Sequence, residues 1–131
     1  MDLQLNGKRA LVTGSTAGIG FAIAKALAAE GAAVVINGRA ADRVEAALAQ
    51  LREACPGAEL SGVTADLATA QGCAALVAVC PDVDLLVNNL GIFDPKPFED
   101  IPDADWLRFF ETNVMSGVRL SRAYLGAMKR R

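Results

Sequence analysis

The sequence has no histidine among its 131 residues. This absence excludes histidine-based catalytic triads, histidine metal sites and a histidine pH switch. The chain has only three cysteines, Cys55, Cys73 and Cys80, and none are spaced as C-x-x-C. That pattern argues against both a disulfide framework and a zinc site. We therefore expect reduced thiols and no metal centre.

Long apolar runs and an excess of one charge are also missing. No stretch approaches the roughly 20 apolar residues that a membrane span requires, and Met1 to Gln4 carry no basic and apolar export signal. The 13 basic and 15 acidic residues give a net charge of −2, so nothing electrostatic favours nucleic acid. We expect a cytoplasmic protein that binds neither membranes nor nucleic acid.

The sequence does contain a regular alternation of strand-like and helix-like segments. Because strands and helices of these lengths alternate, the sequence predicts an α/β fold with right-handed crossovers. We expect one domain over residues 1–131, a Rossmann-type doubly wound parallel sheet of order 3-2-1-4 in three αβα layers. The predicted strands are 8–13, 33–36, 59–63 and 83–87, and the predicted helices are 18–30, 40–54, 69–79 and 103–129.

The fourth predicted strand is nearly all apolar, which predicts burial on both faces. The chain reaches only the helix after it, so no further strand is available to pair with it. A four-stranded, truncated sheet would therefore leave this strand as a bare edge.

A glycine-rich turn follows the first strand, with Gly14, Gly18 and Gly20 in the run from Thr13. Gly14 would allow a sharp turn, Gly18 a close backbone approach to a pyrophosphate, and Gly20 tight packing of the helix on the sheet. Free N–H groups and the positive dipole end of that helix would face the phosphates. The alternative is an ordinary strand-to-helix turn.

Four motifs in the right order resemble the short-chain dehydrogenase/reductase family. Thr13-Gly14-x-x-x-Gly18-x-Gly20 is similar to its cofactor fingerprint, and Asn88-Asn89-Leu90-Gly91 to its Asn-Asn-Ala-Gly motif. Asp66-Leu67 and Asn113 fall where that family has its adenine-ring contact and its catalytic asparagine. The resemblance implies a dinucleotide site made by Gly14, Ser15, Thr16, Gly18, Ile19, Gly20, Arg39, Asp66, Leu67, Asn88, Asn89 and Gly91, with Asn113 holding a water in a proton relay.

Some of these residues also have a purely structural interpretation. Asp66 can serve as a turn or cap residue before the next helix. Asn113 lies in a largely apolar helix, where a buried amide needs a partner such as a carbonyl or a water. Leu90 replaces the alanine of the family motif, which leaves open the shape of the site beside the cofactor.

The end of the second strand favours NADP over NAD. A carboxylate about 20 residues after the glycine turn would grip the ribose hydroxyls of NAD. This chain has Gly38 there, followed by Arg39, whose guanidinium can pair with a 2′-phosphate. Arg39 as a solvated surface charge is the alternative.

The residues that would perform the chemistry are missing. The resemblance implies a serine and a Tyr-x-x-x-Lys pair on a later strand and helix. The one tyrosine, Tyr124, precedes Lys129 by five residues, which places the two side chains roughly 140° apart on a helix. Tyr124 is therefore expected to be a packing residue, and the chain looks like the cofactor-binding half of a longer reductase.

The predicted helix 103–129 is apolar on two sides. Leu107, Phe110, Val114, Leu125 and Met128 share one side, and Trp106, Phe109, Leu120 and Tyr124 the other. One side would cover the sheet and the other would meet a second copy, as in the common dimer of the resembled family. We expect a homo-oligomer.

Three functions remain open at this stage. The first is an NADP-dependent oxidoreductase acting on a small carbonyl or alcohol, inactive as this half alone. The second is a non-catalytic nucleotide-binding or oligomerisation module. The third is an S-adenosylmethionine methyltransferase, which the spacing of the glycine motif, the Asn-Asn-x-Gly motif and Arg39 disfavour.

Overall fold

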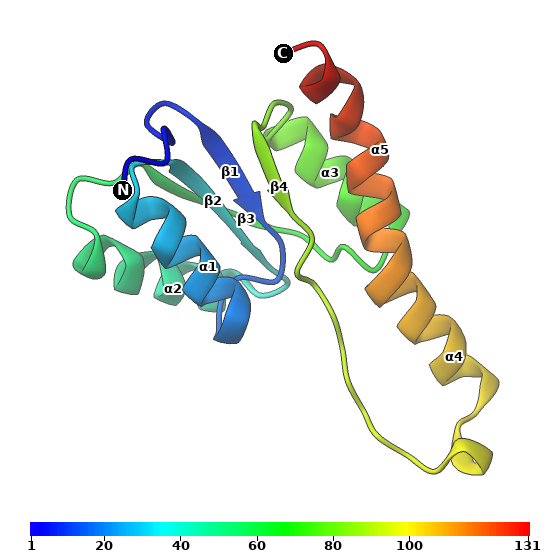
Figure 1. Ribbon diagram of the computed structural model, residues 1–131. Helices are drawn as coiled ribbons and strands as arrows, with labels where there is room; N and C mark the ends of the chain where they lie inside the picture. The colour runs from blue at the N-terminus through cyan, green and yellow to red at the C-terminus, as the bar shows by residue number, and fades with distance from the viewer.

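The computed structural model, which describes residues 1–131, is built on a four-stranded parallel sheet of order β3-β2-β1-β4 (Figure 1). The predicted strand order is confirmed. In the centre, Leu11 pairs with Val35 on one side and with Leu86 on the other. The strands are β1 (Arg9–Val12), β2 (Ala33–Gly38), β3 (Leu60–Thr64) and β4 (Leu85–Val87).

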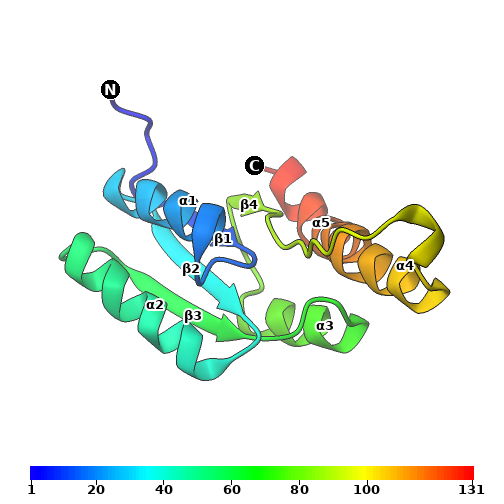
Figure 2. The same cartoon turned by 90° about the horizontal axis from the view of Figure 1, so that it is seen from below.

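Helices cover both faces of this sheet, so the three αβα layers are confirmed (Figure 2). On one face lie α1 (Gly18–Ala29) and α2 (Ala41–Ala54), and on the other lie α3 (Ala70–Val79) and α5 (Ser116–Lys129). None of the helices is both long and apolar enough to cross a membrane.

Neighbouring strand residues point to opposite faces and so build two separate core clusters. Val12 and Ile36 pack with α1 and α2 around Leu48 and Leu51. Leu11 faces the other way and joins a cluster on the α3 and α5 side of the sheet, made with Val35, Leu67, Cys73, Leu76, Cys80, Val83, Leu120 and Tyr124.

The prediction that the fourth strand is buried on both faces is wrong. Leu85, Leu86 and Val87 are all only half-buried. The reason is position, because β4 lies at the edge of the sheet and pairs with β1 alone. The expectation that this strand lies at the edge of the sheet is confirmed. The residue types of an apolar run do not show how far other elements will bury it.

The predicted helix 103–129 is continuous in direction but changes its hydrogen bonding in the middle. It consists of α4 (Asp103–Phe110), a π-helical segment (Glu111–Met115) and α5. A π segment inserts extra backbone into a helix and is found frequently at functional sites. Asn113 lies within it.

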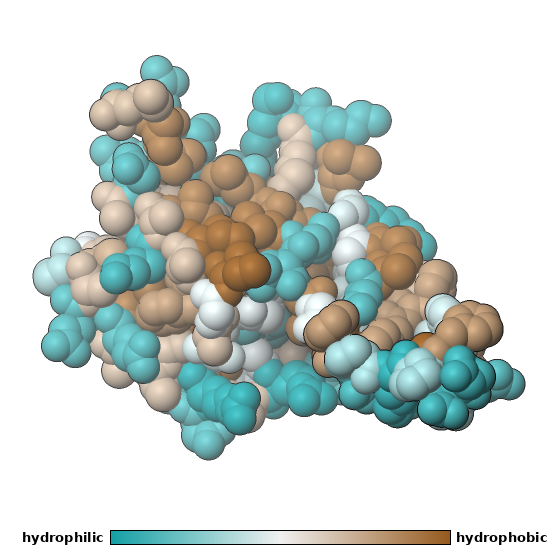
Figure 3. Space-filling view, turned by 60° about the horizontal axis from the view of Figure 1, so that its bottom comes forward, coloured by the Kyte–Doolittle hydropathy of each residue, from teal (hydrophilic) through white to brown (hydrophobic).

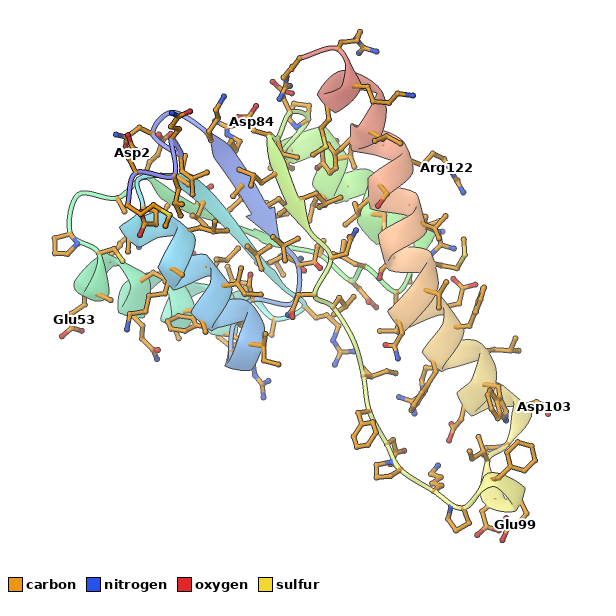
Figure 4. All side chains as sticks on the ribbon, in the orientation of Figure 1. Asp2, Glu53, Asp84, Glu99, Asp103 and Arg122 are labelled. Carbon is orange, nitrogen blue, oxygen red and sulfur yellow. The ribbon has the colours of Figure 1, made fainter.

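The two apolar sides of this helix differ from the prediction. Leu120 and Tyr124 are buried against α3 and the sheet, and Met128 packs beside them. Trp106, on the same predicted side, is exposed, because α4 extends beyond the sheet as an arm. Figure 4 places Asp103 at the far end of this arm.

All three cysteines are free, as expected. Cys73 lies on α3 and Cys80 directly follows it. Both are buried, and burial raises the pKa of both thiols. Cys55 is only half-buried.

Candidate cofactor-binding site

The glycine-rich turn joins β1 to α1 at the carboxyl ends of the strands. Gly14 and Gly18 have φ angles of +56° and +61°, a region that favours glycine. A Cβ atom on Gly18 would meet nothing within 4 Å, so the space over its backbone is open. Figure 3 brings this end forward, and atoms of near-neutral hydropathy gather in the middle of it.

The start of α1 suits an anion. Its N-cap residue, Ala17, makes no side-chain capping bond, and the first turn holds no acidic residue. The N–H groups of that turn are therefore free of a competing side chain, and the dipole favours negative charge. Ile19, in the same turn, is exposed. These residues fit the diphosphate of a dinucleotide.

Gly20 allows α1 to approach the turn. A Cβ atom there would collide with the Gly14 carbonyl oxygen and lie 2.5 Å from Asn89 Nδ2 and 3.0 Å from Ser15 Cα. Only glycine fits this position without displacing backbone. Gly20 does permit a close approach of α1, but to the turn and Asn89 rather than to the sheet as predicted.

Ser15 is fully buried, and its hydroxyl is used inside the protein. It donates to the Val12 carbonyl at 2.6 Å and accepts from the Asn37 N–H at 2.9 Å. The Ser15 N–H in turn donates to the Asn37 carbonyl at 2.9 Å. The side chain of Ser15 therefore holds the turn to the end of β2, and it has no free group to offer a ligand.

Sequence reasoning missed Asn37, which organises this edge of the sheet. Its buried side chain accepts from the Gly14 N–H at 3.1 Å and donates to the Val63 and Ala65 carbonyls at 3.2 and 3.3 Å. One amide thus joins the ends of β1, β2 and β3. The sequence did carry a signal for this role, because Asn37 follows directly on an apolar strand. A buried amide at such a position requires hydrogen-bond partners.

Thr13 and Asn89 connect the glycine-rich turn to the end of β4. The Thr13 hydroxyl accepts from the N–H groups of Asn89 and Leu90, each at 3.0 Å. Asn89 Nδ2 donates to the Thr13 and Gly14 carbonyls at 3.3 and 3.1 Å. Asn89 therefore satisfies backbone groups between the ends of β1 and β4.

Leu90 lies directly against the turn, with its Cα atom 3.1 Å from the place of a Cβ on Gly14. Its side chain packs at the edge of the second core cluster. The core therefore accommodates the larger residue in part, and Leu90 is half-buried. The next residue, Gly91, is exposed at the start of the loop.

Asn88 and Asn113 lie beside the site on its α5 side. Asn88 is exposed and donates to the Ser121 hydroxyl at 3.1 Å, rather than to the strands. Asn113 accepts from the Ile92 N–H at 2.7 Å and donates to the Ile92 carbonyl at 3.1 Å. The expected burial of Asn113 is wrong, because the π segment presents it to an exposed loop, but both its oxygen and its nitrogen are hydrogen-bonded.

The Asp66-Leu67 pair follows β3. Asp66 accepts from the Ala68 N–H at 3.1 Å, which makes it a turn residue, while the N-cap of α3 is Thr69. Leu67 is buried in the core, so only its backbone can reach a ligand. Asp66 is exposed and keeps its second carboxylate oxygen free of internal bonds.

Arg39 immediately follows β2 and is exposed. It belongs to none of the ion pairs in the structure. The guanidinium is therefore available to an external anion at the strand end where a dinucleotide places its adenosine ribose.

Two cavities lie away from this turn. One of about 470 Å³ lies between α3 and α5, beside Ala74, Val77 and Arg119. The other, of about 200 Å³, lies between α4 and the preceding loop, beside Ile101, Trp106 and Phe109. Neither cavity includes a residue of the glycine-rich turn.

The model of a protein family described as short chain dehydrogenase matches residues 8–131. The chain belongs to the short-chain dehydrogenase family.

Individual relatives in the short-chain dehydrogenase family agree with this assignment. The uncharacterized oxidoreductase YvaG of Bacillus subtilis is 56% identical over 128 residues, which cover 98% of this chain and 48% of that protein. The D-beta-hydroxybutyrate dehydrogenase of Cupriavidus necator is 38% identical over 132 residues, covering 98% of this chain and 50% of that protein.

A solved structure has the same arrangement over the whole of this chain. L-sorbose reductase from Gluconobacter frateurii, complexed with NADPH and L-sorbose, matches with a TM-score of 0.93 at 37% identity. The match covers 100% of this chain and 51% of the reductase. The chain spans about half the length of the relatives it matches.

The single tyrosine of this short-chain dehydrogenase chain is a packing residue, as predicted. Tyr124 is 2% exposed and its hydroxyl donates to the Cys80 carbonyl at 2.6 Å. Burial, followed by the nearby Cys80, raises the pKa of the Tyr124 phenol well above its ordinary value. A phenol held in this way cannot deliver a proton at the cofactor site.

An alkaline titration tests this packing. A free tyrosine ionises near pH 10, whereas folded Tyr124 stays protonated, so stability falls as pH rises above about 10, where only the unfolded chain loses the proton. We expect the phenolate absorbance to appear together with the loss of helical circular dichroism. Phenolate formation near pH 10 in a chain that is still folded would contradict the prediction. Tyr124→Phe should cost about 1 kcal/mol of stability.

Proposed function

We propose that this chain is the cofactor-binding half of an NADP-dependent short-chain oxidoreductase acting on a small carbonyl or alcohol. The observation that carries this proposal is the start of α1, where the N–H groups of the first turn have no side-chain cap and the space over Gly18 is open. The cofactor would supply or accept the hydride. The chain's own residues would bind its diphosphate at α1 and its adenosine end between Arg39 and Asp66.

The preference for NADP over NAD is supported by the end of β2. Gly38 leaves no carboxylate to repel a 2′-phosphate, and Arg39 is free to pair with it. The matched L-sorbose reductase is complexed with NADPH. Asn88, Asn89 and Gly91 would line the ribose side, and Asn113 would keep the adjoining loop in place through Ile92.

The cofactor preference is tested by thermal unfolding with each cofactor. NADPH should raise the unfolding temperature more than NADH, because only NADPH offers Arg39 a 2′-phosphate. Arg39→Ala should remove most of that difference, a change of about 1.5–3 kcal/mol for a charge-assisted contact. Arg52→Ala, on the last turn of α2, is the matched control. Equal shifts for both cofactors in the wild type would refute the preference.

The 131-residue chain is expected to show no dehydrogenase turnover, since Tyr124 is buried and no other tyrosine is present. Turnover is measured from the change in cofactor absorbance with a panel of carbonyls and alcohols. Robust turnover would overturn this part of the proposal. The second candidate, a non-catalytic nucleotide-binding module, shares this outcome. The gene downstream of Arg131 separates the two, since a Ser…Tyr-x-x-x-Lys segment there supports the oxidoreductase.

We also propose that the exposed side of α4 and α5 contacts a second copy of the chain. Leu107, Phe110, Val114 and Leu125 are between 44% and 67% exposed along one continuous helix. An apolar stripe of this kind on a helix normally faces another element.

The small carbonyl or alcohol substrate would bind only once the other half of the enzyme is present.

A further inference from the structure

Thr16 and Gly38 approach each other closely at the adenosine end of the candidate site. A Cβ atom on Gly38 would lie 2.5 Å from Thr16 Cγ2 and 3.3 Å from Val44 Cγ2. Gly38 is not among the residues with positive φ, so its backbone does not require glycine. The restriction at position 38 therefore comes from space, and Thr16 is its main source.

Thr16 is held at this distance by its neighbours. Ser15 and Asn37, the residues immediately before Thr16 and Gly38, are joined by two hydrogen bonds of 2.9 Å. One runs from the Ser15 N–H to the Asn37 carbonyl, and the other from the Asn37 N–H to the Ser15 hydroxyl. The turn cannot move away from β2 without breaking both bonds. Threonine is also stiff about χ1, so its methyl group has few alternative positions.

We infer that the Thr16 methyl group restricts the cofactor specificity open to this site, because it excludes an acidic side chain from position 38. A carboxylate at the end of this strand would bind ribose hydroxyls and repel a 2′-phosphate. With the methyl group in place, that carboxylate has no room, and the phosphate keeps its access to Arg39. This inference rests on the proposed function. It adds a steric effect of Thr16 to the electrostatic effect of Arg39 on cofactor specificity.

A double-mutant cycle on the full chain tests the inference, using Gly38→Asp, Thr16→Ser and the two combined. Thr16→Ser removes only the methyl group and keeps the hydroxyl. Gly38→Asp alone should lower the unfolding temperature and bind both NADPH and NADH poorly. The combined variant should recover stability and bind NADH about tenfold better than Gly38→Asp, since residues in contact couple by such amounts. Thr16→Ser alone should keep the preference for NADPH.

Two matched variants keep the test decisive. Gly38→Ala adds only the Cβ atom, so it measures the clash if Gly38→Asp does not fold. Thr16→Val keeps the branched shape without the hydroxyl, and with Gly38→Asp it should behave like Gly38→Asp alone. The inference is overturned if the single variant Gly38→Asp binds NADH as tightly as the double variant that also carries Thr16→Ser. Equal affinity of the wild type for both cofactors would instead contradict the proposed function, while unfolding temperatures without cofactor still report the clash.

Discussion

Replacing Gly20 with alanine is expected to weaken NADPH binding by about ten- to a hundredfold and to destabilise the fold by about 1–3 kcal/mol. The added methyl group would collide with the Gly14 carbonyl and the Asn89 amide, which hold the turn against β4. Since these partners are backbone and a hydrogen-bonded amide, they cannot simply rotate away. Isothermal titration with NADPH and urea unfolding measure the two effects.

The matched control is Gly126→Ala on α5. A Cβ atom there would meet only Arg130 Nη1, at 3.5 Å, so the site is open. Alanine should stabilise this helical position by about 0.5–1 kcal/mol and leave NADPH affinity unchanged. Wild-type affinity in the Gly20→Ala protein would show that the turn tolerates displacement, and the assignment of the site would then fail.

Asn37→Ala is expected to cost about 3 kcal/mol of folding free energy, because buried backbone groups left without partners are expensive. The Gly14 N–H and the Val63 and Ala65 carbonyls would each lose a hydrogen bond from one side chain. The midpoint of urea unfolding should fall with little change in slope. NADPH affinity should fall as well, since Asn37 fixes the turn.

Asn88→Ala provides the comparison for Asn37. Asn88 is exposed and makes one side-chain hydrogen bond, to Ser121, so its removal should cost no more than about 1 kcal/mol. If the two asparagines prove equally dispensable for stability, the joining of three strand ends by Asn37 has no energetic importance.

The fold could be predicted from the sequence because its signals are local. Most of the strands are short apolar runs, and most of the turns have glycine or proline at a boundary, although β3 and the turn after it are exceptions. The three glycines of the first turn were also assigned from spacing alone. The structure gives Gly14 a positive φ, Gly18 open space and Gly20 its close contacts.

The features that sequence reasoning missed depend on contacts between distant residues. Asn37 is buried by partners 23 to 28 positions away. The half-exposure of β4 depends on which elements cover it, whereas its residues, Leu-Leu-Val, are typical of a buried strand. The π segment around Asn113 keeps the apolar spacing of a helix nearly intact, so periodicity cannot reveal it.

The loop between β4 and α4 is fastened at two points. Asn113 holds Ile92 through both its amide groups, and Lys96 donates to Asp105 at 2.6 Å. That hydrogen bond raises the pKa of Lys96 and lowers the pKa of Asp105, so both stay charged through the neutral range. The segment from Ile92 to Asn113 is thus closed into a ring by its own side chains. A ligand settling against Ile92 would meet a preorganised wall, and little further conformational entropy would be lost on binding.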